Sequence, residues 1–197
     1  MEHTRSLRVV CLFGRAAHRV VSRTKESDME RSLETMFSAT VEEVLAALTD
    51  VKLIEAKFAS MGHKDFELLD SSESGGRIVR SYKRTVPVNV PGFASRVLKP
   101  ENVSTQRDEW EPAESDGSRH GTFEIAAAGT PVKVRGTMEL APKGKTSCTY
   151  RAIANIEVKV PLIGGKIAGF VAGDVDKGLA QDAEFTAAAL KKPSKKK

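Results

Sequence analysis

The C-terminal stretch from Leu162 to Leu190 constrains the fold most, because it predicts one long helix with a single apolar stripe. At about 1.5 Å per residue this helix is roughly 40 Å long. Pro161 precedes it and Pro193 follows it, as expected at the two ends of a helix. Such a helix requires a broad apolar surface to pack on. Its apolar residues recur four apart, with Phe170 on the flank: Ile163, Ile167, Val171, Val175 and Leu179.

Two long alternating segments just before this helix predict the surface that it covers. Apolar and polar residues alternate from Val132 to Leu140 and from Cys148 to Val160, and the turn Pro142–Gly144 joins the two segments. Alternation of this kind is typical of strands with one apolar and one polar face, and the short turn makes the strands antiparallel. A sheet with one apolar face needs a cover, so we expect the C-terminal helix to pack on it.

The chain before residue 132 predicts a strand, two helices and four further strands. The first helix begins after Thr40, because Thr40 and Glu43 have the spacing of a capping box, and Gly62 is placed to end the second helix. The segment 102–111 is polar on both faces apart from Trp110, so we expect it at an edge or rim of the sheet. This order predicts an α+β domain. The expected strands are 31–39, 63–70, 77–88, 102–111 and 121–127, and the expected helices are 40–50 and 51–61.

Charge separates the two ends of the chain from its body. Residues 1–28 carry a net charge of +3 and residues 191–197 a net charge of +5, whereas residues 29–190 carry −3. A nucleic-acid-binding fold places its basic patch on the folded surface, so this distribution argues against a nucleic-acid partner. We expect a poorly structured basic extension at 1–28, one folded domain at 29–192 and a lysine-rich tail at 193–197. The oligomeric state stays open.

The N-terminal extension has three interpretations that the sequence leaves open. It is rich in arginine and poor in acids, and Met29 stands just before the first patterned strand. The extension arises from a start codon placed too early, serves as an organelle-targeting presequence, or forms a surface amphipathic helix. Cys11 and Cys148 lie far apart and indicate no disulfide framework, so we expect a reducing compartment, the cytoplasm.

The order of elements and two motifs resemble the START-like, or helix-grip (SRPBCC), superfamily of pollen-allergen proteins, polyketide cyclases and lipid-transfer domains. The motifs are Ser38–Val44 and the helix segments Gly164–Ile167 and Asp182–Phe185, and the resemblance covers about residues 32–190. Within the superfamily the chain is most similar to an uncharacterised bacterial subfamily. The resemblance implies a curved antiparallel sheet of about six or seven strands wrapped around the last helix, with an apolar cavity between them. Members bind lipids, sterols or polyketides, and a minority are enzymes.

The predicted apolar faces supply the candidate ligand-binding residues. On the last helix Gly165, Gly169 and Gly173 lie four apart, which predicts either close packing on the sheet or a groove with room for a ligand. If a cavity exists, we expect its lining to include Phe66, Tyr82, Trp110, Phe123, Ile125, Val134, Met138, Tyr150, Ile156, Ile167, Phe170 and Val171.

Polar residues on these faces leave alternatives open. Tyr150 needs a hydrogen-bond partner for its hydroxyl group, in the protein or in a ligand. Arg84 is either a solvated charge or the partner of an acidic head group, and His63 and His120 are expected to be exposed. No metal-ligand spacing, phosphate-binding loop or acid–base pair is evident, so we expect no metal, no cofactor and no catalytic residue.

Together these features favour a protein that binds or transports a hydrophobic small molecule, lipid, sterol-like or polyketide-like, without catalysis. One alternative is a cyclase or dehydratase that acts on such a ligand, with Tyr82, Arg84, Asp108 or Tyr150 as candidate groups. Another is an interaction module with a filled core. The lysine tail adds a minor hypothesis of weak contact with an anionic membrane, where each lysine contributes about 1 kcal/mol.

Overall fold

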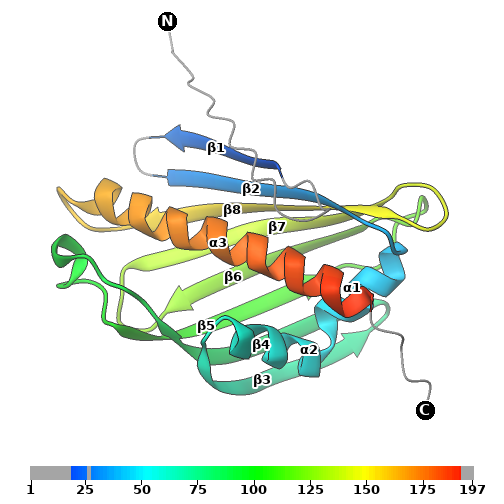
Figure 1. Ribbon diagram of the computed structural model, residues 1–197, viewed down its shortest axis with the longest axis horizontal. Coiled ribbons are helices and arrows are strands. Elements are labelled where there is room, and N and C mark those ends of the chain that lie inside the picture. The colour runs from blue at the N-terminus through cyan, green and yellow to red at the C-terminus, as the bar shows by residue number, and fades with distance from the viewer. Residues whose placement is uncertain (1–18, 26–27, 192–197) are drawn as a thin grey trace, which may run out of the picture.

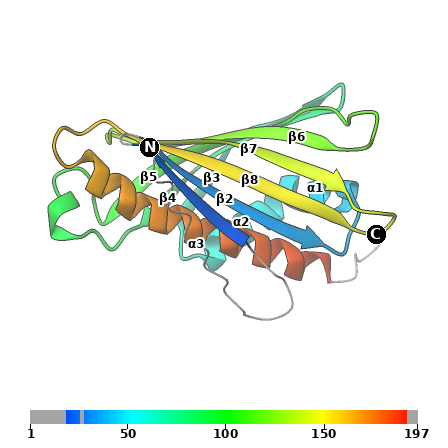
Figure 2. The same ribbon diagram turned by 90° about the horizontal axis from the view of Figure 1, so that it is seen from above.

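The structure, a computed structural model, describes residues 19–25 and 28–191, and in this part of the chain eight strands form one antiparallel sheet. The helix α3 (Gly164–Leu190) lies across the concave face of this sheet (Figures 1 and 2). The protein therefore has the predicted helix-grip fold. The other elements are β1 (Arg19–Lys25), β2 (Asp28–Phe37), α1 (Val41–Thr49), α2 (Val51–Ser60), β3 (Lys64–Ser74), β4 (Arg77–Pro87), the 3-10 turn η1 (Gly92–Ala94), β5 (Glu101–Trp110), β6 (Arg119–Ala127), β7 (Val132–Pro142) and β8 (Cys148–Val158).

The two short helices begin and end where the sequence predicts. The Thr40 side chain accepts a hydrogen bond from the Glu43 backbone at 3.3 Å, and the Glu43 carboxylate accepts one from the Thr40 backbone at 2.8 Å, so the capping box of α1 is confirmed. Asp50 caps α2 in the same way, since its carboxylate accepts from the Leu53 backbone at 3.0 Å. Gly62 follows α2 with a φ of +79°, a left-handed conformation that glycine adopts without strain.

The sheet order is β1-β2-β8-β7-β6-β5-β4-β3, so the first two strands pair with the last one. Leu33 on β2 faces Ala152 on β8, which in turn faces Met138 on β7, and all three are buried on the concave face. The alternation predicted for the last two strands is confirmed, because buried positions follow every second residue of β7 from Val132 and every second residue of β8 from Cys148.

The expectation of a poorly structured segment at 1–28 is wrong for its last part. β1 pairs with β2 along its whole length, from Arg19 opposite Glu34 to Lys25 opposite Asp28. Two valines and a threonine give this segment strand propensity, and the free edge of β2 offers unpaired backbone groups. The additional strand brings the sheet to eight strands. Residues 1–18 and the expected tail at 193–197 lie outside the described residues.

The strand β5 lies inside the sheet, between β4 and β6, and not at the expected edge. Its polar side chains suggested an edge because a polar face usually points to water. Along β5, however, Asn102 and Ser104 are buried although they are polar. The interior of this half of the sheet is therefore partly polar, and this polar wall belongs to the cavity described below.

The helix α3 contacts the sheet through β2 and β8 and uses small side chains to do so. Ala168, Ala172 and Ala183 are buried there, and Asp176 accepts a hydrogen bond from Arg31 on β2 at 3.1 Å. Of the larger residues of the predicted stripe, Ile167 is fully buried and the others are partly buried. The glycine hypothesis is wrong in both forms, because Gly165, Gly169 and Gly173 are exposed and do not line the cavity. An added Cβ atom would meet nothing within 4 Å at Gly165 and Gly173, and at Gly169 only the end of the Met29 side chain, at 3.8 Å.

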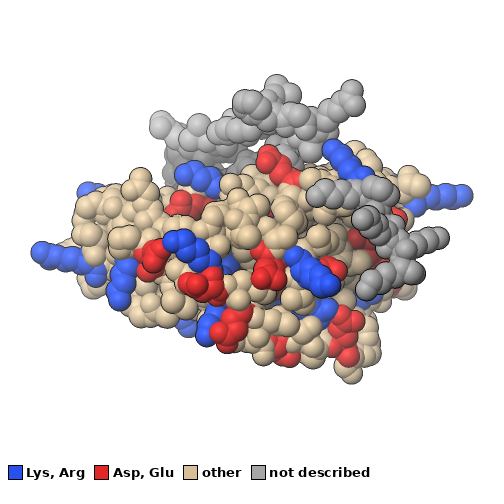
Figure 3. Space-filling model, turned by 60° about the horizontal axis from the view of Figure 1, so that its bottom comes forward, with Lys and Arg blue, Asp and Glu red and all other residues tan. Residues whose placement is uncertain are grey.

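The outer surface carries charges of both signs. On the face seen in Figure 3, lysine and arginine side chains are interspersed with aspartate and glutamate side chains. Elsewhere on the surface, charged side chains also pair across neighbouring strands, as in Lys83–Glu67 at 2.7 Å and Arg135–Glu124 at 3.1 Å. These exposed pairs contribute little to stability. Within the described residues, no helix is both long and apolar enough to cross a membrane.

Candidate ligand cavity between the sheet and the last helix

A cavity of about 500 Å³ lies between the concave face of the sheet, α3, α2 and the segment that joins β4 to β5. Its volume is in the range of small-molecule sites in proteins, roughly 300–1,000 Å³. The cavity exists because α3 packs over β2 and β8, at one side of the sheet, and leaves the inner faces of β4, β5 and β6 uncovered by the helix (Figure 1).

Two glycines allow large aromatic side chains to lie flat against the cavity wall. Phe123 on β6 stands opposite Gly136 on β7, where an added Cβ atom would come within 2.4 Å of the Phe123 ring and 2.1 Å of the Ile153 carbonyl oxygen. Trp110 on β5 stands opposite Gly121 in the same way, at 2.9 Å. These glycines let the rings pack down onto neighbouring strands and leave the space above them open.

Most of the predicted ligand-binding residues are brought together around this cavity. The residues that line it are Trp110, Phe123, Ile125, Val134, Met138, Tyr150, Phe170 and Val171. Ile156 is fully buried in the main core instead, and Ile167 packs with Leu98 and Val132 in a separate apolar cluster. Tyr82 and Phe66 pack with Phe58 of α2 beside the cavity and do not line it. Whether the lining residues bind a ligand stays a prediction.

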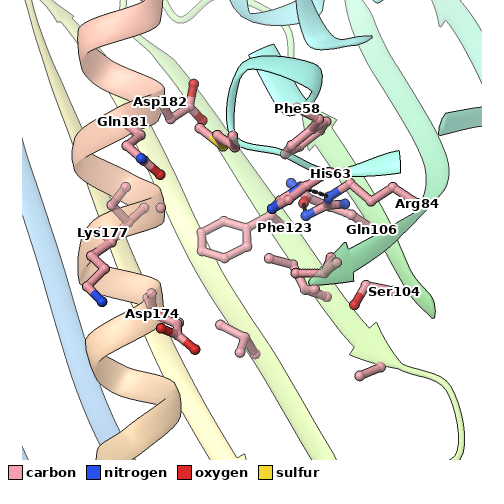
Figure 4. A pocket seen from close by; sticks show the side chains of 18 of the residues that line it. Phe58, His63, Arg84, Ser104, Gln106, Phe123, Asp174, Lys177, Gln181 and Asp182 are labelled. Atoms are coloured by element: carbon pink, nitrogen blue, oxygen red, sulfur yellow. Dashed lines mark hydrogen bonds between the residues drawn. The ribbon is translucent and has the colours of Figure 1, made fainter. Parts of the chain in front are cut away.

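Arg84 on β4 is buried in the cavity wall, with only 5 % of its surface exposed. Of the two alternatives that the sequence leaves open for Arg84, the solvated charge is therefore wrong. Its Nε donates a hydrogen bond to Nδ1 of His63 at 3.2 Å, and its Nη2 donates to Oε1 of Gln106 at 2.9 Å. The guanidinium also lies 3.8 Å from the centre of the Phe58 ring, a cation–π contact (Figure 4). Burial lowers the pKa of Arg84, and nearby Tyr82 and the acids Asp108 and Asp182 act in the opposite direction.

A chain of hydrogen bonds continues from Arg84 to a buried acid. Gln106 also contacts Asp108, because its Nε2 donates a hydrogen bond to Oδ1 of Asp108 at 2.8 Å. The Tyr82 hydroxyl donates a second hydrogen bond to Oδ2 of Asp108 at 2.6 Å. Asp108 is partly accessible although it lies in the interior, because its accessible surface faces the cavity. Burial raises the pKa of Asp108, and the two hydrogen bonds and Lys57 offset part of this effect.

His63 forms part of the same wall, whereas the sequence predicts an exposed side chain. Its ring stacks on Phe58 with the ring centres 5.4 Å apart. Burial, and then the charge of Arg84, lower the pKa of His63 to about 4, so the ring is neutral at pH 7. Because Nδ1 accepts the hydrogen bond from Arg84, the single ring proton is on Nε2.

The opposite wall of the cavity is supplied by α3, which contributes both apolar and charged side chains. Asp174, Lys177, Gln181 and Asp182 lie along it, facing Phe58, His63 and Arg84 across the cavity (Figure 4). Asp182 accepts a hydrogen bond from the buried Lys57 of α2 at 2.8 Å, and this ion pair joins the two helices. Burial raises the pKa of Asp174, and the neighbouring Lys177 opposes this shift.

Tyr150 presents an unused hydroxyl group to the cavity. The residue is only 4 % exposed, and its hydroxyl has no hydrogen-bond partner among the described residues. The alternative in which a protein group is the hydrogen-bond partner of the Tyr150 hydroxyl is therefore wrong for the described residues. Burial, and the nearby charges of Asp182 and Asp108, raise the pKa of Tyr150 well above its usual value, so the hydroxyl keeps its proton. Cys148 behaves as the predicted small apolar residue, since it is fully buried and burial raises its pKa to about 11.

The sequence interpretation did not identify the polar half of the cavity lining. The available signal was the alternation on β5, which places Asn102, Ser104, Gln106 and Asp108 on the same face as Trp110. Lys57 and Phe58 were missed because they come from α2, whose position relative to the sheet cannot be read from its own pattern. The described residues contain no group of three or more histidine, cysteine, aspartate or glutamate side chains placed to hold a metal ion.

Comparison with known sequences assigns the chain to a family. The profile of the family described as "Protein of unknown function (DUF2505)" matches residues 32–190, which include the whole cavity wall. The chain belongs to the DUF2505 family. The match begins within β2 and ends at the last residue of α3, so it covers the sheet from β2 onward and all three helices. No curated protein matches this DUF2505 chain.

Solved structures share the fold of this DUF2505 protein at low sequence identity. A STAR-related lipid transfer protein from Xanthomonas axonopodis has a TM-score of 0.66 and 13% identity over 94% of this chain and 99% of that chain. The human StAR-related lipid transfer protein 5 has a TM-score of 0.59 and 12% identity, covering 93% and 86%. The Zhui aromatase/cyclase from Streptomyces sp. R1128 has a TM-score of 0.58 and 14% identity, covering 83% and 93%. At these identities the similarity shows the START-like fold.

Proposed function

We propose that this protein binds or transports a hydrophobic small molecule, lipid, sterol-like or polyketide-like, in the cavity between the sheet and α3. The observation that carries the proposal is the cavity itself, about 500 Å³ with a mainly apolar lining and a few polar groups on two of its walls. This combination is typical of sites that bury an apolar ligand and orient it through a small number of polar contacts. The structural neighbours support it, since two of them are lipid transfer proteins and one is an aromatase/cyclase.

Native mass spectrometry of protein purified from its own host tests this function. We expect a co-purifying hydrophobic molecule of defined mass, bound at one copy per chain. A matched pair of variants on β6 locates the site. Ile125→Trp fills the cavity and should abolish co-purification, whereas Glu124→Trp, which is exposed on the other face, should retain it. A ligand-free mass for the wild-type protein, together with no binding across a lipid panel, contradicts the proposal.

A second candidate, a cyclase or dehydratase that acts on such a ligand, is favoured by the titratable side chains in the cavity wall. Asp108, His63 and Lys57 all line the cavity, and acid–base chemistry needs groups of this kind beside the substrate. Incubating the identified ligand with the protein separates the two functions. A carrier returns the ligand with its mass unchanged. An enzyme converts it, and Asp108→Asn then stops the conversion while binding persists.

The cavity volume argues against the third alternative, an interaction module with a filled core. Such a module would leave a void well below the roughly 300 Å³ of the smallest usual ligand sites. The observed volume is about 500 Å³.

A further inference from the structure

The cavity wall contains a buried cation with an unused hydrogen-bond donor. Nη1 of Arg84 is buried and has no hydrogen-bond partner, one of only two such side-chain atoms among the described residues. The partners that Arg84 does have, His63 Nδ1 and Gln106 Oε1, are both neutral. The guanidinium therefore has hydrogen bonds on two of its three nitrogens and a direct counter-charge on none of them.

The nearby acids are each engaged elsewhere. Asp108 receives its hydrogen bonds from Tyr82 and Gln106, and Asp182 pairs with Lys57. They act on Arg84 across a distance and not through contact. Burying a cation without a paired anion is costly, and the Phe58 ring 3.8 Å away supplies an attraction to the guanidinium but no counter-charge.

The surroundings of Arg84 indicate where the body of a ligand lies. Arg84 and Phe58 stand on one wall, and in Figure 4 the Phe123 side chain lies between them and α3. Beyond Phe123 the lining continues with Ile125 on the same strand and with Val134, its partner on β7. One end of the space thus lies against a buried cation, whose Nη1 itself has almost no accessible surface, and apolar side chains line the stretch along β6 and β7.

We propose that the cavity selects hydrophobic molecules that end in an anionic group, a carboxylate or a phosphate monoester, and that the Arg84 guanidinium binds this group. This inference rests on the proposed function and narrows it to one class of ligand. A two-armed guanidinium suits both anions because it donates parallel hydrogen bonds to two oxygens. The anion supplies the counter-charge that Arg84 lacks, while the apolar tail occupies the space along β6 and β7.

A set of probes with one tail and different heads tests the selection. Tetradecanoate, monotetradecyl phosphate, tetradecanol and methyl tetradecanoate are titrated into the wild-type protein by isothermal calorimetry, at concentrations below micelle formation. We expect at least one of the two anions to bind about tenfold or more tightly than the alcohol and the ester, because hydrogen bonds to charged groups contribute about 1.5–3 kcal/mol. Comparing the affinities of tetradecanoate and monotetradecyl phosphate shows whether the carboxylate or the phosphate is preferred.

Variants assign the selection to Arg84. Arg84→Met should remove the preference for the anions over tetradecanol. Arg84→Lys, which keeps the charge but has one donor arm, should weaken anion binding severalfold. Arg107→Met is the control, because Arg107 lies on the adjacent strand β5 with its side chain half exposed. It should change none of the four affinities.

The outcomes separate this inference from the function on which it rests. If all four probes bind the wild-type protein equally, the cavity binds hydrophobic molecules but the anion selection is wrong, and Nη1 takes a water molecule or a hydroxyl group. If none binds, the anion selection is wrong, and the proposed function fails as well when the purified protein also has a ligand-free mass. Persistence of the anion preference in Arg84→Met overturns the role of Arg84. The wild-type series needs no variant, so it decides the ligand class even if Arg84→Met does not fold.

Discussion

At the scale of single residues, Arg84 and His63 determine each other's hydrogen-bonding roles. Arg84 has donors only, so Nδ1 of His63 acts as the acceptor and has to be free of a proton. The ring stays neutral because burial and the Arg84 charge lower its pKa to about 4. Protonation of His63 breaks this hydrogen bond and places two cations side by side in the cavity wall. The hydrogen bond from Arg84 to His63 therefore exists only while His63 is neutral.

The lowered pKa of His63 predicts that stability falls in mild acid. The unfolded chain takes up this proton with an ordinary pKa of 6.5 and the folded chain only near pH 4. Between these values the unfolded state holds more protons, so the free energy of unfolding rises with pH across the window and its gain is complete above it. Because His63 is only half-buried, we expect a loss of about 1–2 kcal/mol between pH 7 and pH 4.5, after allowance for solvent screening.

Urea unfolding of matched variants at these two pH values measures the effect. His63→Gln retains an acceptor for Arg84 but no titrating ring, so its stability should depend less on pH than that of the wild-type protein. His120→Gln replaces an exposed histidine and should follow the wild-type protein. Equal pH dependence in all three proteins would contradict a depressed pKa at His63.

Gly136 is a second residue whose identity is set by contact. A methyl group there would overlap the Phe123 ring at 2.4 Å and the Ile153 carbonyl at 2.1 Å. Gly136→Ala should therefore lower the free energy of unfolding by about 1–3 kcal/mol and push the Phe123 ring into the cavity, weakening ligand binding. Chemical denaturation and ligand titration check the two effects. If the variant is as stable as the wild-type protein, β6 and β7 adjust to the added methyl group at little cost in free energy.

At the scale of elements, three sets of residues on α3 lie in different surroundings. Ala168 and Ala172 are buried, Val171, Val175 and Leu179 line the cavity, and Gly165, Gly169 and Gly173 are exposed. Four-residue spacing is shared by all three sets, which is why spacing alone did not distinguish them. The small contact residues bring the helix close to one side of the sheet. The cavity on the other side follows from that off-centre position.

The outward position of the α3 glycines yields a prediction about the helix. Gly173 is exposed, and no described atom lies within 4 Å of the position of an added Cβ. Gly173→Ala should raise the free energy of unfolding by about 0.5–1 kcal/mol, because alanine restricts the unfolded chain and favours the helix. Ligand affinity should not change. Thermal unfolding and ligand titration test these two outcomes. A loss of ligand affinity would show that Gly173 contributes to ligand binding after all.

At the scale of the whole molecule, the fold followed from patterns that each lie within one segment. The capping box at Thr40, the alternation from Val132 to Val160 and the apolar stripe of α3 determine element types without knowledge of their neighbours. The apolar lining followed from the same alternation. The polar lining did not, because a polar residue on a strand indicates solvent unless the opposite wall is known. For Arg84 that wall is Phe58 and His63, which come from α2 and the segment after it.

The prediction that belongs to this scale concerns β1. The described cavity lining begins at Leu48, and β1 contacts the rest of the sheet through β2 alone among the described strands. A chain that begins at Met29 should therefore fold and bind the same ligand with unchanged affinity. It should unfold at a lower temperature, because the β1–β2 hydrogen bonds are lost, and should associate at high concentration, because β2 becomes an open edge.

Thermal unfolding, ligand titration and sedimentation velocity of this shortened chain test the three parts separately. The full-length chain is the control in each measurement. A shortened chain that unfolds cooperatively and still binds ligand would show that the domain from β2 to α3 is a complete binding unit, with β1 as an added edge. If it fails to fold at low concentration, β1 is an essential part of the sheet, and the cavity depends on the eighth strand although no described lining residue comes from it.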